Sequence, residues 1–193
     1  KSNLTENSDK TLTRVESTSN GVLVEKYSAN GKTLVSKSTV KKELPIYGGY
    51  FSGKNNNYIV FGQQNKSEKD SAEIVRIVKY SKSWSKISDC KIYGSNTTVP
   101  FDAGSLRMIE LDGKLYVYTC HEMYADSNKL NHQANMLFTV DESTMKTTDS
   151  MYEVSNLQDG YVSHSFNQFI KTDGTYIYRV DHSESNNMSM GGQ

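Results

Sequence analysis

The four histidines of the chain have the clearest capacity for chemistry, because imidazole titrates near neutral pH and can act as an acid, a base or a metal ligand. They are His121, His132, His164 and His182. His121-Glu122 lacks a second histidine at the spacing of a metalloprotease helix, so we expect no metal site. Gln64, His121 and His182 recur at intervals of 57 and 61 residues, which predicts equivalent positions in a repeated unit.

Aromatic, amide and carboxylate side chains accompany these histidines. Aromatic rings can stack on sugars while polar groups bind hydroxyls. The candidate ligand-binding residues are Gln64, Asp102, His121, Tyr124, Asn131, His132, Tyr161, His164, Asn167 and His182. His121, His164 and His182 are also the candidate catalytic residues. A structural role stays open for each: a histidine at a strand end can bond a neighbouring backbone, and Asp102 can stabilise a turn.

The elements that must position these residues are short β-strands. Alternating segments rich in Tyr, Val and Ile occupy Asn57–Phe61, Lys114–Thr119 and Tyr176–Val180. A turn signal precedes each one, and two of these signals are Asp-Gly pairs, which favour β-hairpins. No segment of a dozen residues has an amphipathic helical stripe. The sequence therefore predicts an all-β chain.

The hairpins repeat about every 57–61 residues, counted from Tyr58, Leu115 and Tyr176. Four short strands in such a period are typical of propeller blades. We predict a β-propeller-like array of four-stranded antiparallel blades that forms an incomplete ring; a β-sandwich or another β-solenoid is the alternative. The predicted bounds are a polar tail at 1–10, a partial blade at 11–44, full blades at 46–100 and 101–160, a partial blade at 161–185 and a tail at 186–193.

This rhythm resembles the kelch, WD40 and six-bladed propeller class of secreted bacterial repeat proteins over residues 11–185. The Trp-Asp dipeptide is absent and a Gly-Gly doublet occurs once, at Gly48-Gly49. The block from His164 to Asn167 also resembles one found in exported proteins. These resemblances imply an extracellular or cell-surface location in a bacterium and supply no activity.

The connections between strands sort the candidate residues by position. In an antiparallel meander, successive connections lie at opposite ends, so the first–second and third–fourth turns share one end. The candidate residues fall in the connections of the other end, where propellers commonly bind ligands. We predict these connections as loops at 62–72, 98–105, 120–133 and 160–167, with a further one beginning at Asp181. Trp84 falls beside a third–fourth turn, and we interpret it as packing between units.

Composition excludes several kinds of partner. Lys and Arg total 22, as do Asp and Glu, so a nucleic acid is not expected. The longest apolar run is too short to cross a membrane. Cys90 and Cys120 are too few for a disulfide framework, although one bridge stays open. No cofactor motif occurs, and the unpaired strand edges of an incomplete ring predict a homo-oligomer or blades missing from a longer parent chain.

Three functional hypotheses follow. The first is a binding module that recognises a polar small molecule or glycan on the face bearing the histidines. The second is a propeller enzyme of the sulfotransferase or polysaccharide-lyase kind, with histidines on adjacent blades as acid, base or nucleophile. The third is a purely structural role. An enzyme needs imidazoles within about 3 Å of a reacting atom, whereas a binding site needs only a platform and hydroxyl partners.

Overall fold

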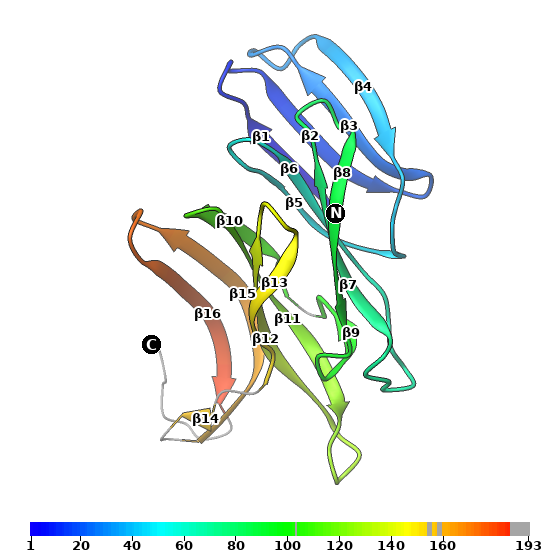
Figure 1. Ribbon diagram of the computed structural model, residues 1–193, viewed down its shortest axis with the longest axis vertical. Helices are drawn as coiled ribbons and strands as arrows, with labels where there is room; N and C mark the ends of the chain where they lie inside the picture. Colours follow the sequence, from blue (N-terminus) through cyan, green and yellow to red (C-terminus); the bar gives the residue numbers. More distant parts are fainter. Residues whose placement is uncertain (103, 154–155, 158–159, 186–193) are drawn as a thin grey trace.

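The chain is built from β-strands arranged in four antiparallel sheets (Figure 1). The computed structural model describes residues 1–102, 104–153, 156–157 and 160–185, and at 156–157, 160–166 and 182–185 it describes the backbone alone. No helix occurs in this part of the chain, and none therefore is long and apolar enough to cross a membrane. The all-β prediction is confirmed.

The first sheet is a meander whose strands pair in chain order. Its strands are β1 (Ser2–Glu6), β2 (Leu12–Thr18), β3 (Gly21–Tyr27) and β4 (Leu34–Val40). The sequence predicts a tail over 1–10, whereas β1 pairs with β2 along its whole length. Leu4 is the one large apolar residue of β1 and is exposed, so backbone pairing with β2 holds this strand in place. The strand therefore has no apolar alternation from which it could be predicted.

The second sheet repeats the meander. It contains β5 (Ile46–Ser52), β6 (Asn57–Gly62), β7 (Glu73–Tyr80) and β8 (Lys86–Tyr93). The predicted hairpin at residues 53–56 joins β5 to β6. Every residue of β6 is buried, because this central strand has a sheet neighbour on each side and a packed layer on each face.

The third sheet has five strands. They are β9 (Thr97–Pro100), β10 (Arg107–Leu111), β11 (Lys114–Ala125), β12 (Asn131–Asp141) and β13 (Lys146–Met151). β9 lies outside the meander and pairs with the far half of β11, although the sequence assigns it to the preceding unit. The segment 120–133, predicted as a loop, instead continues β11 and β12 as a long hairpin, and only 126–130 turns.

The fourth sheet contains β14 (Asn156–Leu157), β15 (Gly160–Thr172) and β16 (Ile177–Ser185). The predicted Asp-Gly hairpin at 173–174 joins β15 to β16. β15 packs against β10, β11 and β12 of the third sheet. The first strands of the three four-stranded meanders are also neighbours, since β1 lies beside β5 and β5 beside β10, and β10 in turn lies beside β15 of the fourth sheet.

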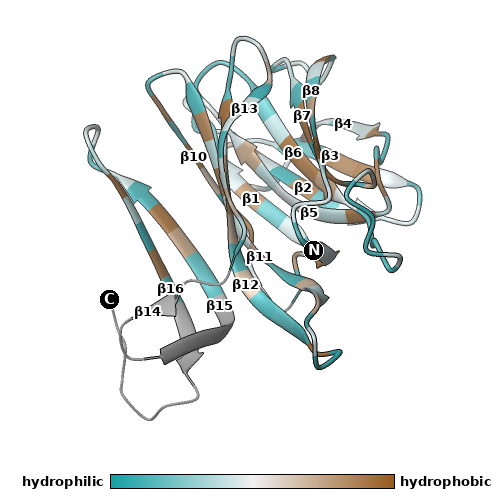
Figure 2. Cartoon of the chain, turned by 60° about the horizontal axis from the view of Figure 1, so that its bottom comes forward, coloured by the Kyte–Doolittle hydropathy of each residue, from teal (hydrophilic) through white to brown (hydrophobic). Residues whose placement is uncertain are grey.

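Two apolar cores join the first three sheets. Hydrophobic and hydrophilic residues alternate along many strands (Figure 2), so a sheet can bury a face against its neighbour. Val15, Val22 and Val24 of the first sheet pack with Phe61 and Val78 of the second. A larger core unites the second and third sheets, and it includes Tyr58, Ile77, Leu115, Met136 and Phe138.

The backbone of β6 lies very close to side chains at the end of β9, where the second and third sheets meet. A Cβ atom at Gly62 would lie 2.6 Å from the Phe101 ring and 2.8 Å from Pro100. Glycine is therefore required where the end of β9 crosses β6. Cys90 and Cys120 are both buried and free, so the disulfide left open by the sequence does not form.

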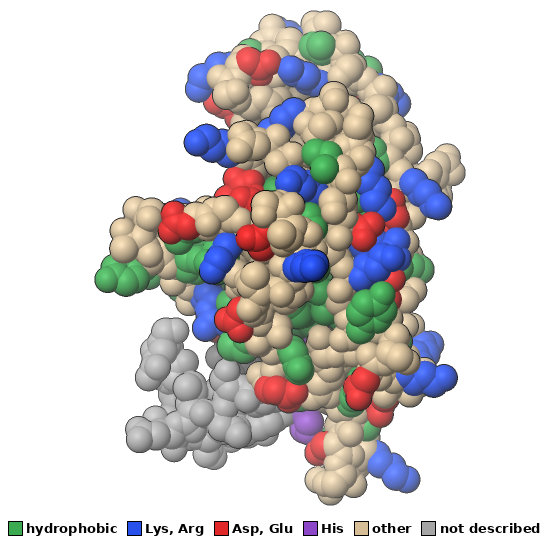
Figure 3. Space-filling model, viewed as in Figure 1, with side chains coloured by type: hydrophobic (Ala, Val, Ile, Leu, Met, Phe, Trp, Pro, Cys, Tyr) green, Lys and Arg blue, Asp and Glu red, His purple; other side chains and the backbone are tan. Residues whose placement is uncertain are grey.

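The sheets present two ends with different connections. We call the turn end the one formed by residues 7–11, 53–56, 81–85, 112–113 and 141–145, and the loop end the opposite one, where 63–72 and 126–130 lie. Basic and acidic side chains are interspersed over the face seen in Figure 3. This mixture agrees with the zero formal net charge.

Candidate functional site

His121 is a buried structural residue of β11. The exposed fraction of this residue is 0%. Nε2 lies 2.8 Å from the Tyr152 carbonyl, which accepts from it, and Nδ1 lies 2.6 Å from the Thr97 hydroxyl. Burial lowers the pKa of His121 to about 4, although the Tyr152 carbonyl acts in the opposite direction. The neutral ring thus uses both nitrogens inside the protein and offers neither to a ligand.

Tyr124 is held in a hydrogen-bonded cluster at the loop end. Its hydroxyl accepts from Asn65 Nδ2 at 3.0 Å, and its backbone N–H donates to Asn96 Oδ1 at 3.2 Å. Asn65 is buried and also binds the carbonyls of Lys69 and Thr97. The cluster anchors connection 63–72 to β9 and β11.

The other described loop-end candidates either bind groups of the protein or lie exposed. Asn131 is exposed and donates to the Met123 carbonyl at 2.8 Å, while His132 Nε2 lies 3.1 Å from Asp126 Oδ2. Asp102 is half-buried and accepts a hydrogen bond from Gln133. Gln64 and Asn167 are exposed.

Three candidates lie outside the described side chains: Tyr161, His164 and His182. Their backbone belongs to β15 and β16, and the register places His182 opposite Phe166. The convergence of histidines expected from the sequence thus stays a prediction for His164 and His182. His121 does not reach the surface to join them.

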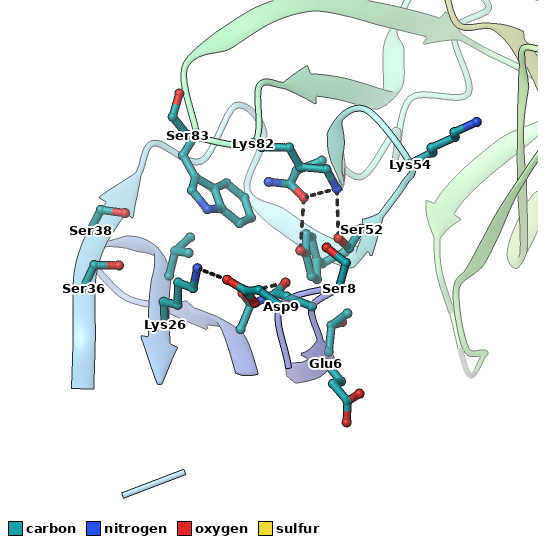
Figure 4. Close-up of a pocket in the computed structure, with 17 residues that line it drawn as sticks. Glu6, Ser8, Asp9, Lys26, Ser36, Ser38, Ser52, Lys54, Lys82 and Ser83 are labelled. Atoms are coloured by element: carbon teal, nitrogen blue, oxygen red, sulfur yellow. Dashed lines mark hydrogen bonds and ion pairs between the residues drawn. The ribbon is translucent and has the colours of Figure 1, made fainter. Parts of the chain in front are cut away.

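A groove opens at the turn end, between the first and second sheets, with a volume of about 730 Å³ (Figure 4). The turn between β1 and β2 borders it, together with β4, the β5–β6 hairpin and the turn between β7 and β8. Its volume falls within the range of about 300–1,000 Å³ typical of small-molecule sites. The groove is at the end opposite to the one that the sequence favours.

Trp84 supplies an aromatic surface to this groove. The turn 81–85 closes with hydrogen bonds from Ser81 N to Ser85 O at 2.8 Å and from Trp84 N to Ser81 O at 3.0 Å. Trp84 takes a φ of 71°, a left-handed conformation that favours glycine. Its ring lies 5.5 Å from Tyr50 and 5.9 Å from Tyr80, centroid to centroid. Trp84 is half-buried, so these contacts hold the indole while part of it faces the groove.

Polar groups surround the aromatic surface. Tyr50 donates its hydroxyl to Asn57 Oδ1 at 3.2 Å. The same amide oxygen lies 3.5 Å from Lys82 Nζ, which also reaches Ser52 Oγ at 3.1 Å (Figure 4). Serine hydroxyls complete the lining, at Ser8, Ser36, Ser38 and Ser83. The groove therefore offers hydroxyl, amide and ammonium groups around a ring.

The charged side chains on the groove wall formed by the first sheet are largely paired. Lys26 Nζ lies 2.9 Å from Asp9 Oδ2, and Glu6 Oε1 lies 2.9 Å from Lys10 Nζ. Hydrogen bonds from Thr11, with help from Lys26, lower the pKa of Asp9 to about 2. In the described part of the chain, no group of three or more His, Cys, Asp or Glu residues could hold a metal ion.

A second groove lies at the same end, between the second and third sheets. Glu110 faces it, with one oxygen accepting from the Lys54 backbone N–H at 2.7 Å. Glu142 accepts from the Tyr58 hydroxyl at 2.7 Å and also hydrogen-bonds Glu110. Burial first, and then Glu142, raises the pKa of Glu110 to about 7, against the opposing effect of the Lys54 N–H. Glu110 therefore changes its protonation state near neutral pH.

The sequence predicts that Trp84 is a packing residue, and its contacts with Tyr50 and Tyr80 confirm this, but the sequence does not predict that part of the ring faces a groove. A signal was present, because Ser81-Lys82-Ser83-Trp84-Ser85 interrupts two alternating strands as a short turn. A large aromatic residue in such a turn stands at the rim of the sheet. Its neighbours across the groove lie in another sheet, which local patterns cannot reveal.

Comparison with known proteins finds no matching family and no matching curated protein. Among solved structures, a mutant of the apocarotenoid oxygenase of Synechocystis is similar over 90% of this chain, with 9% sequence identity and a TM-score of 0.49. This chain covers 46% of that protein's length. So distant a likeness says nothing about what this chain binds or does.

Proposed function

We propose that the protein is a binding module for a polar ligand, most simply a carbohydrate, and that the ligand lies in the turn-end groove on Trp84. The observation that carries the proposal is the half-buried indole, held by Tyr50 and Tyr80 and surrounded by hydroxyl and amide groups. Sugar rings present an apolar C–H face and a rim of hydroxyls. A ring bordered by hydrogen-bonding side chains complements both features.

The position of Trp84 supports the same function. No described residue accepts a hydrogen bond from its indole N–H, so this donor is available to a ligand. The turn and two ring contacts fix the indole before a ligand arrives, which reduces the entropy lost on binding. The loop-end residues offer less, because His121 and Tyr124 already use their polar atoms within the protein.

The single tryptophan of the chain makes this proposal directly measurable. We expect neutral oligosaccharides that bind to change the intrinsic fluorescence in a titration. Trp84→Gly, which suits the φ of 71° and preserves the turn, should weaken binding at least about tenfold by calorimetry, a loss of about 1.4 kcal/mol. Trp84→Phe should retain part of the affinity, because it keeps an aromatic surface.

The control for this experiment is Asn131→Ala at the exposed loop end. It should bind as the unchanged protein does. Loss of binding in Asn131→Ala with full binding in Trp84→Gly would reject the groove and favour the loop end.

We further propose that the four sheets are blades of a propeller-like array. The meander order of each sheet and the succession of neighbouring first strands support this arrangement. Association through uncovered strand edges and a location outside the cell both stay predictions. Light scattering that finds a monomer at all concentrations would count against the homo-oligomer.

A further inference from the structure

We propose that the turn-end groove selects an anionic sugar, with Lys82 binding its carboxylate or sulfate group. This inference rests on the proposed carbohydrate-binding function and specifies its ligand class. It concerns the wall of the groove formed by the β5–β6 hairpin and the turn 81–85.

The ammonium of Lys82 contacts only uncharged oxygens. It donates to Ser52 Oγ at 3.1 Å, lies 3.5 Å from Asn57 Oδ1 and also contacts the Gly53 carbonyl (Figure 4). None of these acceptors carries the negative charge that an ammonium binds most strongly. The contacts therefore hold Lys82 in place without giving it a charged hydrogen-bond partner.

The remaining groove charges do not supply the missing partner. Asp9 is paired with Lys26, and Glu6 with Lys10, on the wall formed by the first sheet. No carboxylate of the described chain forms an ion pair with Lys82. The charge of Glu110 acts on Lys82, but the pKa of Glu110, about 7, leaves this carboxyl group only partly ionised at neutral pH.

The aromatic surface and the ammonium are parts of one hydrogen-bonded unit. Trp84 contacts the ring of Tyr50, the Tyr50 hydroxyl donates to Asn57, and Asn57 lies beside Lys82. The same turn carries Lys82 and Trp84, two residues apart. A sugar lying on the indole therefore has a fixed cation beside it. Lys54, which also lines the groove, adds a second positive charge nearby.

Matched pairs of oligosaccharides test this inference. Oligogalacturonate is compared with its methyl ester, and a sulfated chondroitin tetrasaccharide with its desulfated, carboxyl-reduced form, by Trp84 fluorescence at low ionic strength. We expect one acidic member or both to bind at least about tenfold more tightly than its neutral partner. The pair that shows the preference identifies the anionic group. Added salt should reduce that preference.

Variants at Lys82 connect the preference to one residue. Lys82→Met should abolish the preference and keep binding of the neutral sugar, whereas Lys82→Arg should retain much of it. Lys32→Met, in the exposed turn between β3 and β4, removes the same charge outside the groove and should leave the preference intact.

The outcomes separate the two proposals. Equal binding of acidic and neutral partners, or a preference that survives Lys82→Met, overturns the anionic selectivity and leaves carbohydrate binding standing. An absence of binding to every oligosaccharide in these and the neutral titrations overturns the proposed function itself.

Discussion

Replacing His121 by alanine should lower the free energy of unfolding by at least about 3 kcal/mol. The substitution removes two hydrogen bonds, one of them fully buried, leaves the Tyr152 carbonyl without its donor and opens a cavity in place of a side chain that has no solvent access. Urea denaturation measures this loss. His121→Gln should lose less, because its amide can still donate to the carbonyl. His132→Ala, at a half-exposed position, should change stability by less than about 1 kcal/mol.

The pH dependence of His121 gives a second measurement. Its pKa is about 4 in the folded protein, below its ordinary 6.5, so its contribution is fully present above pH 6.5 and is lost as pH falls to 4. The stability advantage over His121→Gln should therefore shrink by about 3 kcal/mol across that window. Asp9 and Asp141, with pKa values of about 2, act only at lower pH. A constant advantage would show that this histidine does not titrate as its burial requires.

The carboxyl pair Glu110 and Glu142 should oppose His121 in its effect on pH stability. The pKa of Glu110 is raised from 4.5 to about 7 in the folded protein, so its stabilising contribution is complete below pH 4.5 and is lost as pH rises through 7. Glu110→Gln imitates the protonated group. Its melting temperature should match that of the unchanged protein near pH 5 and exceed it by at least about 2 °C at pH 8.

A variant of Glu142 tests whether this carboxyl group contributes to the raised pKa of Glu110. Glu142→Gln removes the like charge and should also flatten the dependence above pH 6. The double variant should gain little beyond either single one, because both remove the same repulsion. Glu153→Gln, at an exposed position, is the matched control and should follow the unchanged protein at every pH. Additive gains in the double variant would contradict the coupling.

Groups from the β5–β6 hairpin, β6, β7 and the β7–β8 turn surround this pair, and they determine the direction of the pKa shift. The Lys54 N–H and Lys82 favour ionised Glu110, while Glu142 disfavours it; Tyr58 and Lys79 bind the Glu142 side chain and carbonyl. The net effect raises the pKa of Glu110.

The hairpins could be predicted from the sequence because their determinants are local. Asp112-Gly113 and Asp173-Gly174 lie between apolar, β-rich segments, and both form the expected turns. β1 could not be predicted, since its pairing with β2 needs no apolar pattern. β9 was also missed as part of the third sheet, because its pairing with β11 joins residues more than twenty positions apart.

The candidate site could be predicted less well, for a similar reason. His121 has its two partners at Thr97 and Tyr152, so its buried role depends on contacts far along the chain. Trp84 meets Tyr50 and Tyr80 only when strands align. In both cases the residue type indicated which chemistry the side chain could perform, but tertiary contacts decided which side chain faces solvent.

The alkylation rates of the two free thiols report how fast neighbouring sheets separate. Cys90 lies in the core between the second and third sheets, whereas Cys120 donates to the Asp102 carbonyl and lies beside Gln168, where the third sheet meets the fourth. Burial raises the pKa of both thiols, that of Cys120 to about 12, so alkylating reagents must wait for an opening event. Equal alkylation rates would mean that the stack opens as one cooperative unit. Faster alkylation of Cys120 than of Cys90 would show that the fourth sheet separates independently of the others.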